Sequence, residues 1–298
     1  MMSHKFRFSE KCMDRLKEYC GKIDKAGKSV LETTARKKKK EDAVPAEAPA
    51  VVHEVPEFII PVIDGIIALT DKGCVRPSNQ DAVIVAKDFA GVADGMGGHR
   101  GGEVASSSAR DLLMGFLEGK EPDETELKTA VECVNQRLFI QQAEDESLSG
   151  MGTTLTVLWA AEKQLYIAHV GDSRAYRLRE GKLTQITRDH SMVEEMVRQG
   201  MLTPEQAACH PMRNVITRAV GTEAGIDVDM IVEERHPGDV WLLCSDGLHG
   251  MVSDERMQEV LTENKPEEAA DILMEAAKEA GGRDNISVVI YLDGEAGQ

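Results

Sequence analysis

Apolar residues recur from about residue 58 to residue 292 in two kinds of pattern. Short runs rich in Val, Ile, Leu and Ala, bounded by Gly, Pro, Asn or Asp, are typical of strands. They lie at 58–69, 82–86, 89–93, 153–159, 164–170, 228–233, 239–244 and 286–292, with a hairpin at 175–186. Apolar residues at three- and four-residue steps predict helices at 103–117, 123–146, 191–199, 253–262 and 266–280. Residues 201–211 fit neither pattern, and with the short helix before them they form a candidate flap.

The predicted strands fall into two groups and the predicted helices into pairs. Such an arrangement favours an α+β fold over alternating β-α-β units. We therefore expect a layered sandwich of two antiparallel β-sheets flanked by helix pairs, with a small flap subdomain. This domain should occupy residues 56–294, because the apolar runs start near Phe58.

Residues 1–55 differ in composition and are predicted to be an N-terminal extension of the domain. Apolar residues at helical spacing predict one short amphipathic helix, and they are Phe8, Cys12, Leu16, Tyr19 and Ile23. A basic run at 36–40 follows, and 41–56 is rich in Ala, Pro and Glu, as linkers are. The basic run suits either a solvated tether or contact with an anionic partner or membrane surface, and both interpretations stay open.

Charge is divided unevenly along the 298 residues. Residues 1–40 hold 13 Lys and Arg against 5 Asp and Glu, a net charge of +8, and the remainder holds 22 against 47, a net charge of −25. An acidic domain repels polyanions, so a nucleic-acid substrate is disfavoured. No apolar stretch is long enough to span a bilayer and the N-terminus lacks the apolar core of a signal peptide, so we expect a cytoplasmic protein. The six cysteines include no C-x-x-C pair, which disfavours a zinc site or a disulfide framework.

Five aspartates lie where predicted strands begin or end, and four of them are next to Gly, Ser or Asn. The clearest is Asp94, which ends an apolar run and is followed by five glycines within eight residues. The others are Asp81, Asp172, Asp246 and Asp284. A single aspartate in such a place is usually a turn or cap residue. Five of them suggest instead that the carboxylates converge on one rim of the fold.

Converging carboxylates repel one another strongly unless cations lie between them. Sites made only of oxygen ligands select Mg²⁺ or Mn²⁺ over zinc, and two such ions can hold a bridging hydroxide and clamp a phosphoryl group for hydrolysis. Arg76, five residues before Asp81, is a candidate phosphate ligand because guanidinium binds phosphate through two parallel hydrogen bonds. The sequence has no G-x-S-x-G motif and no cysteine with a basic neighbour suited to act as a nucleophile, which disfavours a covalent intermediate.

Six short segments occur in an order that is itself informative. They are Thr70-Asp71-x-Gly73-x-x-Arg76-x-x-Asn79-Gln80-Asp81, Asp94-Gly95-Met96-Gly97-Gly98, Gly152-Thr153-Thr154, Gly171-Asp172-Ser173-Arg174, Ser245-Asp246-Gly247-Leu248 and Asp284-Asn285. With them, residues 66–292 resemble the type 2C metal-dependent serine/threonine protein phosphatases, the PPM family, in their compact bacterial form. The resemblance implies hydrolysis of phosphoserine and phosphothreonine in proteins by a hydroxide bridging two Mn²⁺ or Mg²⁺ ions, without a covalent intermediate. It also implies phosphoprotein substrates made by a serine/threonine kinase.

The resemblance implies a role for each metal ligand. Asp94 would bridge the two ions, and the carbonyl of Gly95 would be a further ligand. Asp246 and Asp284 would complete the shell of the first ion. Asp172, together with Asp246, would form the third and weaker metal site that is typical of bacterial members.

The resemblance also implies roles beside the metals, and two departures from the family pattern. Asp81 would orient the attacking water, Arg76 would bind the substrate phosphate, and residues 190–220 would be the family's flap. Gln80 stands where the family usually has a Glu that helps to hold the second metal, so that metal is expected to bind less tightly. Met96 stands where animal members have a His that acts as an acid, so water is expected to protonate the leaving group, as in bacterial members.

Two histidines lie near these motifs without an implied catalytic role. His99 is interpreted as a surface residue, and His190 as a residue that orders the start of the flap helix. Two other functions stay open. A phosphoprotein-binding module without turnover is motivated only by Gln80, and a metal-dependent nuclease is opposed by the acidic domain.

Overall fold

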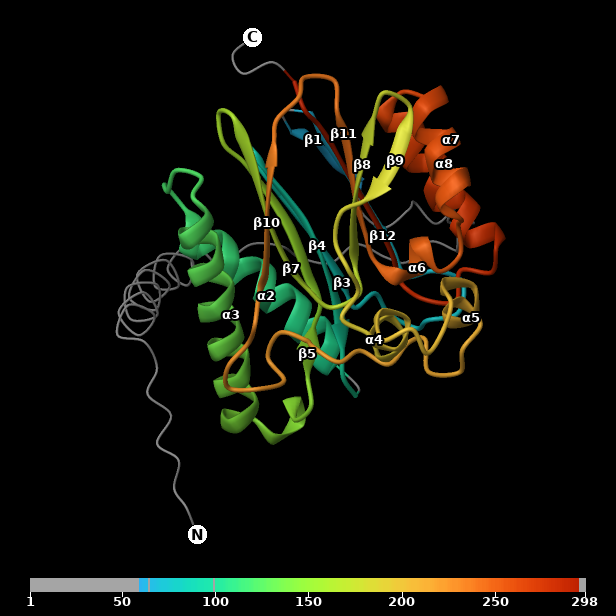
Figure 1. Ribbon diagram of the computed structural model, residues 1–298. Helices are drawn as coiled ribbons and strands as arrows, with labels where there is room; N and C mark the ends of the chain where they lie inside the picture. The colour runs from blue at the N-terminus through green and yellow to red at the C-terminus, as the bar shows by residue number, and fades with distance from the viewer. Residues whose placement is uncertain (1–58, 64, 99, 295–298) are drawn as a thin grey trace, which may run out of the picture. The chain divides into compact units, whose positions relative to one another are not determined.

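The computed structural model describes residues 59–294, apart from residues 64 and 99. Two antiparallel β-sheets pack face to face, and a pair of long helices lies outside each sheet (Figure 1). This architecture confirms the predicted α+β sandwich. The predicted extension at 1–55 and the side chain of His99 lie outside the described residues, so the domain boundary stays a prediction.

Each sheet has six strands within the described range, and every pairing is antiparallel. The first sheet has the spatial order β1 (Ile59–Ile63), β2 (Ile66–Asp71), β12 (Ile286–Leu292), β11 (Val240–Cys244), β8 (Arg174–Arg179) and β9 (Lys182–Gln185). The second has the order β10 (Asp229–Glu234), β7 (Gln164–Val170), β6 (Leu155–Ala160), β4 (Phe89–Met96) and β3 (Asp81–Ala86), with the short β5 (Gly152–Thr153) paired to the end of β4.

The long helices cover the outer faces of the sheets (Figure 1). Those on the second sheet are α2 (Gly101–Leu117) and α3 (Glu124–Glu144), and those on the first are α7 (Asp254–Glu263) and α8 (Pro266–Glu279). The shorter helices are α4 (Met192–Arg198), α5 (Pro204–Ala208), α6 (Asp246–His249) and the 3₁₀ turn η1 (Glu146–Leu148). Asp123 and Ser253 cap α3 and α7 by accepting a backbone N–H of the first turn, which satisfies a donor that has no partner inside the helix.

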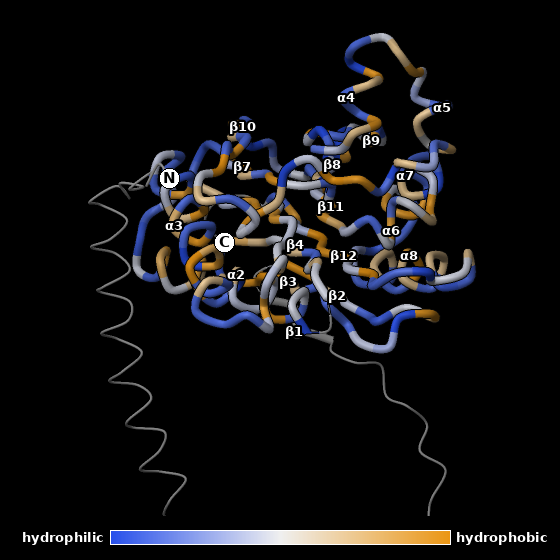
Figure 2. Tube along the Cα trace, turned by 90° about the horizontal axis from the view of Figure 1, so that it is seen from below, coloured by the Kyte–Doolittle hydropathy of each residue, from blue (hydrophilic) through white to orange (hydrophobic). Residues whose placement is uncertain are grey.

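Strand β12 shows how the layers share the core. Val289 and Tyr291 point into the cluster between the two sheets, where they join Trp241, whereas Val288 and Ile290 point into the cluster beneath α7 and α8. Because both faces of this strand are covered, its sequence is an almost uninterrupted apolar run. Figure 2 shows the hydrophobic residues concentrated inside the sandwich and the polar ones along its outer turns.

The structure differs from the sequence prediction in two segments. The single strand predicted at 58–69 is the hairpin β1–β2, because Gly65 adopts a φ of 83° and reverses the chain. Residues 201–211, predicted to be irregular, contain α5. This helix begins with a capping box in which Thr203 and Gln206 satisfy each other's backbone N–H groups.

Three smaller elements were a predicted hairpin, a predicted strand and a helix that was not predicted. The predicted hairpin at 175–186 is confirmed as β8–β9, with Glu180 and Gly181 at positive φ in the two-residue turn. The strand predicted at 153–159 is divided into β5 and β6, and the short helix α6 was not predicted. The division of the strand and the extra helix are local differences that leave the layers as predicted.

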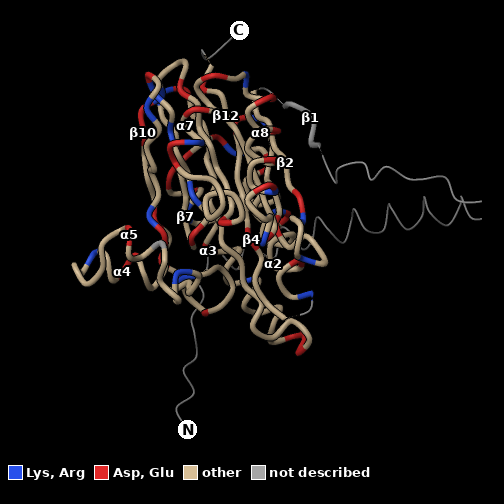
Figure 3. Tube along the Cα trace, turned by 90° about the vertical axis from the view of Figure 1, so that its right-hand side faces the viewer, with Lys and Arg blue, Asp and Glu red and all other residues tan. Residues whose placement is uncertain are grey.

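The flap, residues 190–220, carries α4 and α5 away from the sandwich (Figures 2 and 3). Ser191 caps α4 by accepting the N–H of Glu194 at 3.3 Å. His190 joins the base of the flap to the loop after β7: its N–H donates to the carbonyl of Gly171, and its Nδ1 accepts the Gly171 N–H at 3.0 Å. These contacts are those expected of a residue that orders the start of the flap helix.

Candidate metal centre

The five predicted aspartates all lie at strand ends on one side of the sandwich. Asp81 begins β3 and Asp94 lies near the end of β4, directly opposite it in the antiparallel pair. Asp172 and Asp246 each lie two residues beyond a strand, and Asp284 lies two residues before β12. The carboxyl group of Asp94 interacts electrostatically with the other four. The structure therefore brings all five together.

Asp81 is fixed through one of its two carboxylate oxygens. The hydroxyls of Ser245 and Ser287 each donate to its Oδ2 at 2.7 Å, whereas its buried Oδ1 has no hydrogen-bond partner among the described residues. Burial, with the negative charges of Asp246 and Asp284, raises the pKa of Asp81 to about 7 in spite of the two hydroxyls. Asp81 was predicted from the sequence, whereas Ser245 was quoted only within a motif and Ser287 was not singled out.

Asp94 occupies the centre of the cluster. Its N–H donates to the hydroxyl of Thr154, and its carbonyl accepts the N–H of Thr154 and the hydroxyl of Thr153, so its backbone is held from both sides. Its carboxyl group interacts electrostatically with that of Asp246. Burial, together with Asp81 and Asp246, raises the pKa of Asp94 well above its ordinary value.

Asp246 and Asp172 form the side of the cluster nearest the flap. Asp246 starts α6, and burial together with Asp284 raises its pKa to about 6. Burial and the charge of Asp246 raise the pKa of Asp172 to about 8. Each has a buried Oδ1 for which the described part of the chain offers no partner. These are the orphaned oxygens expected of ligands for a cation.

Arg76 lies beside the carboxylates with its side chain 49% exposed. Its NH2 group donates to Oδ2 of Asp284 at 2.7 Å, and this bond raises the pKa of the guanidinium. Asn285, next in the chain, donates to the carbonyls of Lys72 and Ser78 and thereby holds the loop that carries Arg76. The loop and the start of β12 are therefore fixed to each other.

Gly95 and Gln80 meet at the first turn of α2. A Cβ atom on Gly95 would lie 2.1 Å from the carbonyl oxygen of Gly102, so only glycine allows the strand to approach the helix this closely. A Cβ on Gly102 would lie 2.6 Å from the Gly95 carbonyl oxygen and 2.8 Å from Oε1 of Gln80. The carbonyl and the amide oxygen that were predicted as ligands thus face the same small space.

The donor set fits a hard divalent cation. As the side chains stand, no group of three or more His, Cys, Asp or Glu in the described ranges is arranged to hold a metal ion. Asp284 is instead paired with Arg76. The chemistry nevertheless suits Mg²⁺ or Mn²⁺. Every side-chain donor is an oxygen, and three buried carboxylate oxygens of the cluster lack a partner among the residues described. A cation would also remove the mutual repulsion that raises these pKa values.

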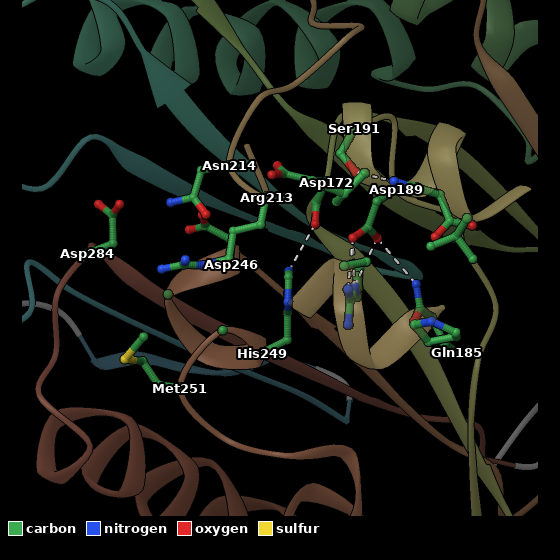
Figure 4. Close-up of a pocket in the computed structure, with 18 of the residues that line it drawn as sticks. Asp172, Gln185, Asp189, Ser191, Arg213, Asn214, Asp246, His249, Met251 and Asp284 are labelled. Carbon is green, nitrogen blue, oxygen red and sulfur yellow. Dashed lines mark hydrogen bonds and ion pairs between the residues drawn. The ribbon is translucent and has the colours of Figure 1, made fainter. Parts of the chain in front are cut away.

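A cavity of about 490 Å³ lies between the flap and the carboxylates (Figure 4). Asp172, Asp246 and Asp284 line it from the strand ends, and Arg213 and Asn214 line it from the flap. Apolar residues of α4 and α5 complete its wall, namely Val193, Val197, Pro204 and Ala207. The cavity therefore gives a ligand at the carboxylates a second, partly apolar surface.

The sequence is similar to that of known protein phosphatases. The family model for Protein phosphatase 2C matches residues 76–279. The serine/threonine protein phosphatase PstP of Mycobacterium tuberculosis is 42% identical over 229 residues, which cover 75% of this chain and 44% of that protein. The serine/threonine phosphatase stp of Listeria monocytogenes is 41% identical over 233 residues, which cover 74% of this chain and 92% of that protein. The chain thus spans less than half the length of the mycobacterial relative.

Solved structures agree with the sequence matches. The crystal structure of M. tuberculosis PstP/Ppp superposes with a TM-score of 0.74 at 40% identity, over 77% of this chain and 98% of that one. The catalytic domain of PstP in complex with two manganese ions has a TM-score of 0.71 at 39% identity, over 76% of this chain and 96% of that one. The chain belongs to the protein phosphatase 2C family.

Proposed function

We propose that this chain is a Mn²⁺- or Mg²⁺-dependent phosphatase that hydrolyses phosphoserine and phosphothreonine in proteins, by attack of water and without a covalent intermediate. The observation that carries the proposal is the convergence of five carboxylates from both sheets next to one half-exposed arginine. The two manganese ions in the related PstP structure support the choice of metal.

The same residues have separate roles in this proposal. Asp94, Asp246 and Asp284 would hold one ion, Asp94 with the Gly95 carbonyl and Gln80 a second, and Asp172 with Asp246 a third, weaker one. When bound, such ions acidify water and neutralise phosphoryl oxygens. Each of these aspartates lies at a strand end or within two residues of one.

Asp81 and Arg76 would act on the water and the phosphate. With Oδ2 of Asp81 occupied by two serine hydroxyls, its Oδ1 is the atom available to accept a hydrogen bond from the attacking water. Arg76 would exchange its bond to Asp284 for a bidentate contact with the phosphate.

Substrates and location follow as proposals from the same chemistry. Phosphoproteins made by a serine/threonine kinase are the expected substrates, and the cytoplasm is the proposed site of action. Among the residues that the structure describes, no helix is long and apolar enough to cross a membrane.

Hydrolysis by the purified full-length chain tests the function. With MnCl₂ present, the protein should hydrolyse p-nitrophenyl phosphate and a phosphothreonine peptide, and excess chelator should abolish both activities because the carboxylates alone cannot neutralise the phosphate. A phosphotyrosine peptide of the same sequence is the matched control and should react much more slowly. Stoichiometric binding of the phosphothreonine peptide without phosphate release would instead identify a binding module, and cleavage of single-stranded DNA a nuclease.

Gln80 allows a separate test of the second metal ligand set. Gln80→Glu should tighten the binding of the second Mn²⁺ on the order of tenfold, because a carboxylate replaces a neutral amide oxygen beside the Gly95 carbonyl. Isothermal titration with MnCl₂ measures the change. Gln199→Glu adds the same charge at the exposed end of α4 and should leave the affinity unaltered. Equal affinities in Gln80→Glu and the parent protein would mean that the amide already serves as well as a carboxylate.

A further inference from the structure

His249 is a pocket residue that the sequence analysis did not single out. It ends the four-residue helix α6, three residues after Asp246, so the two side chains lie on the same side of the helix. It lines the cavity between the flap and the carboxylates (Figure 4). The motif that begins with Ser245 explains Asp246 but gives no reason for a histidine here.

The histidine makes one specific contact. Its Nε2 lies 3.0 Å from the backbone carbonyl oxygen of Asp172 (Figure 4). Because a carbonyl can only accept, Nε2 must carry the hydrogen and donate it. The bond joins α6, which follows β11 of the first sheet, to the loop after β7 of the second sheet. It therefore connects the backbone of Asp172 to α6, the helix that carries Asp246.

The two carboxylates need such a connection because they repel each other. The charge of Asp246 raises the pKa of Asp172, and the charge of Asp189 raises the pKa of both. Each of the two carboxylates has a buried Oδ1 with no partner in the described part of the chain. The nearby guanidinium of Arg174 is committed to Asp189 through three hydrogen bonds of 2.8–3.2 Å. Repulsion favours movement of the Asp172 loop away from α6, and the His249 bond opposes it.

The other side of the Asp172 loop is held independently. His190 bonds to both backbone groups of Gly171, the residue before Asp172. The loop is thus fixed to the base of the flap through Gly171 and to α6 through the Asp172 carbonyl. Two histidines from different segments hold two consecutive residues of one loop.

We propose that His249 is a positioning residue for the divalent-cation site formed by Asp172 and Asp246, which it keeps at a fixed separation. In this role it acts through its hydrogen bond to the backbone carbonyl of Asp172. The inference rests on the proposed metal dependence, but it concerns cation binding and does not require turnover. Groups that orient metal ligands from outside the first shell typically change metal affinity ten- to a hundredfold when removed.

Two substitutions separate the hydrogen bond from the shape of the ring. His249→Phe keeps the ring and removes the donor, whereas His249→Gln places an amide N–H at the reach of Nε2. In titrations of the full chain with MnCl₂, followed by calorimetry and by the electron paramagnetic resonance of bound Mn²⁺, the phenylalanine variant should lose about ten- to a hundredfold in affinity at the weakest site only. The glutamine variant should restore most of it.

A second background and a control variant test whether the loss of Mn²⁺ affinity arises at the site that contains Asp172. In an Asp172→Asn background the weakest site is already removed, so adding His249→Phe should change Mn²⁺ binding no further. His236→Phe replaces a half-exposed histidine away from the cavity and should bind Mn²⁺ as the parent does. If the phenylalanine variant does not fold, His249→Asn, whose amide is too short to reach the carbonyl, replaces it.

Three results would overturn the proposal: unchanged affinity of the weakest site in His249→Phe, an equal loss at all sites, or no recovery in His249→Gln. The titration is informative even if the protein proves to have no phosphatase activity, because it counts ions and not turnovers. Failure of the proposed function and failure of this inference are therefore distinguishable.

Discussion

Replacing Asp94 with Asn should lower the turnover of phosphothreonine peptide by at least about a thousandfold and, in chelator, should make the protein more stable. The side chain sits between four other carboxylates, and burial and those charges raise its pKa well above the ordinary value. Asparagine has the same shape and no charge, so it removes the repulsion. It also removes the one ligand proposed to be shared by two ions, and a thousandfold loss corresponds to about 4 kcal/mol of transition-state stabilisation.

Activity and thermal unfolding of the same preparations test this. The matched control is Asp271→Asn, which removes one carboxylate from the exposed face of α8 and should change neither quantity appreciably. The unfolding temperature in chelator should rise for Asp94→Asn and stay constant for the control. Turnover within a few-fold of the parent value in Asp94→Asn would refute the assignment of Asp94 to the metal centre.

This opposition between stability and activity explains the arrangement around Asp94. A cluster of buried like charges costs folding free energy, and the protein offsets the cost locally. The hydroxyls of Ser245 and Ser287 stabilise the Asp81 carboxylate by hydrogen bonds, and the Arg76 guanidinium balances the charge of Asp284. These partners stabilise the cluster without occupying every carboxylate oxygen, which leaves the remaining oxygens for cations.

Much of the fold follows from the spacing of apolar residues. Strand β12 and the helices α7 and α8 were predicted within one or two residues, because burial imposes a regular period on them. The missed elements depend on something other than a period. The hairpin β1–β2 turns on the backbone of Gly65, and α5 depends on its capping box.

In the candidate site, too, some residues had a local signal in the sequence and others did not. The five aspartates could be found because each adjoins a strand end and a turn residue, which is a local signal. Ser287 had only a weak signal, a hydroxyl in the middle of an apolar strand, and Ser245 was quoted only as part of a motif. Asn285 was likewise quoted only as part of a motif, and His249 had no signal. The roles of both depend on carbonyls far away in the sequence that only the tertiary structure brings near. The convergence of the carboxylates was therefore predictable, and the groups that position them were not.

The acidic cluster also predicts an unusual dependence of stability on pH. Burial and mutual repulsion raise the pKa values of Asp246, Asp81 and Asp172 from 3.8 to about 6, 7 and 8. Below about pH 4 these carboxyl groups are protonated in both the folded and the unfolded protein, and the folded state is then at its most stable with respect to them. This stability is lost as the pH rises through the three folded-state pKa values. Burial lowers the pKa of His169 and His249 from 6.5 to about 4, which makes stability rise with pH between those limits. Above pH 6.5 only the aspartates remain, so the net effect there is a loss.

In chelator, the unfolding temperature of the full chain should therefore fall between pH 6.5 and about 8.5. The loss is on the order of 2 kcal/mol, which for a domain of this size corresponds to roughly 5 °C. With millimolar MnCl₂ the trend should reverse, because deprotonated carboxylates bind the ions more tightly and bound ions stabilise the folded state. Asp172→Asn, which removes the group with the highest of the three values, should flatten the slope in chelator. Scanning fluorimetry at matched ionic strength measures all three, and an unfolding temperature that rises with pH in chelator would show that the carboxylates are not the buried, mutually repelling cluster that metal binding requires.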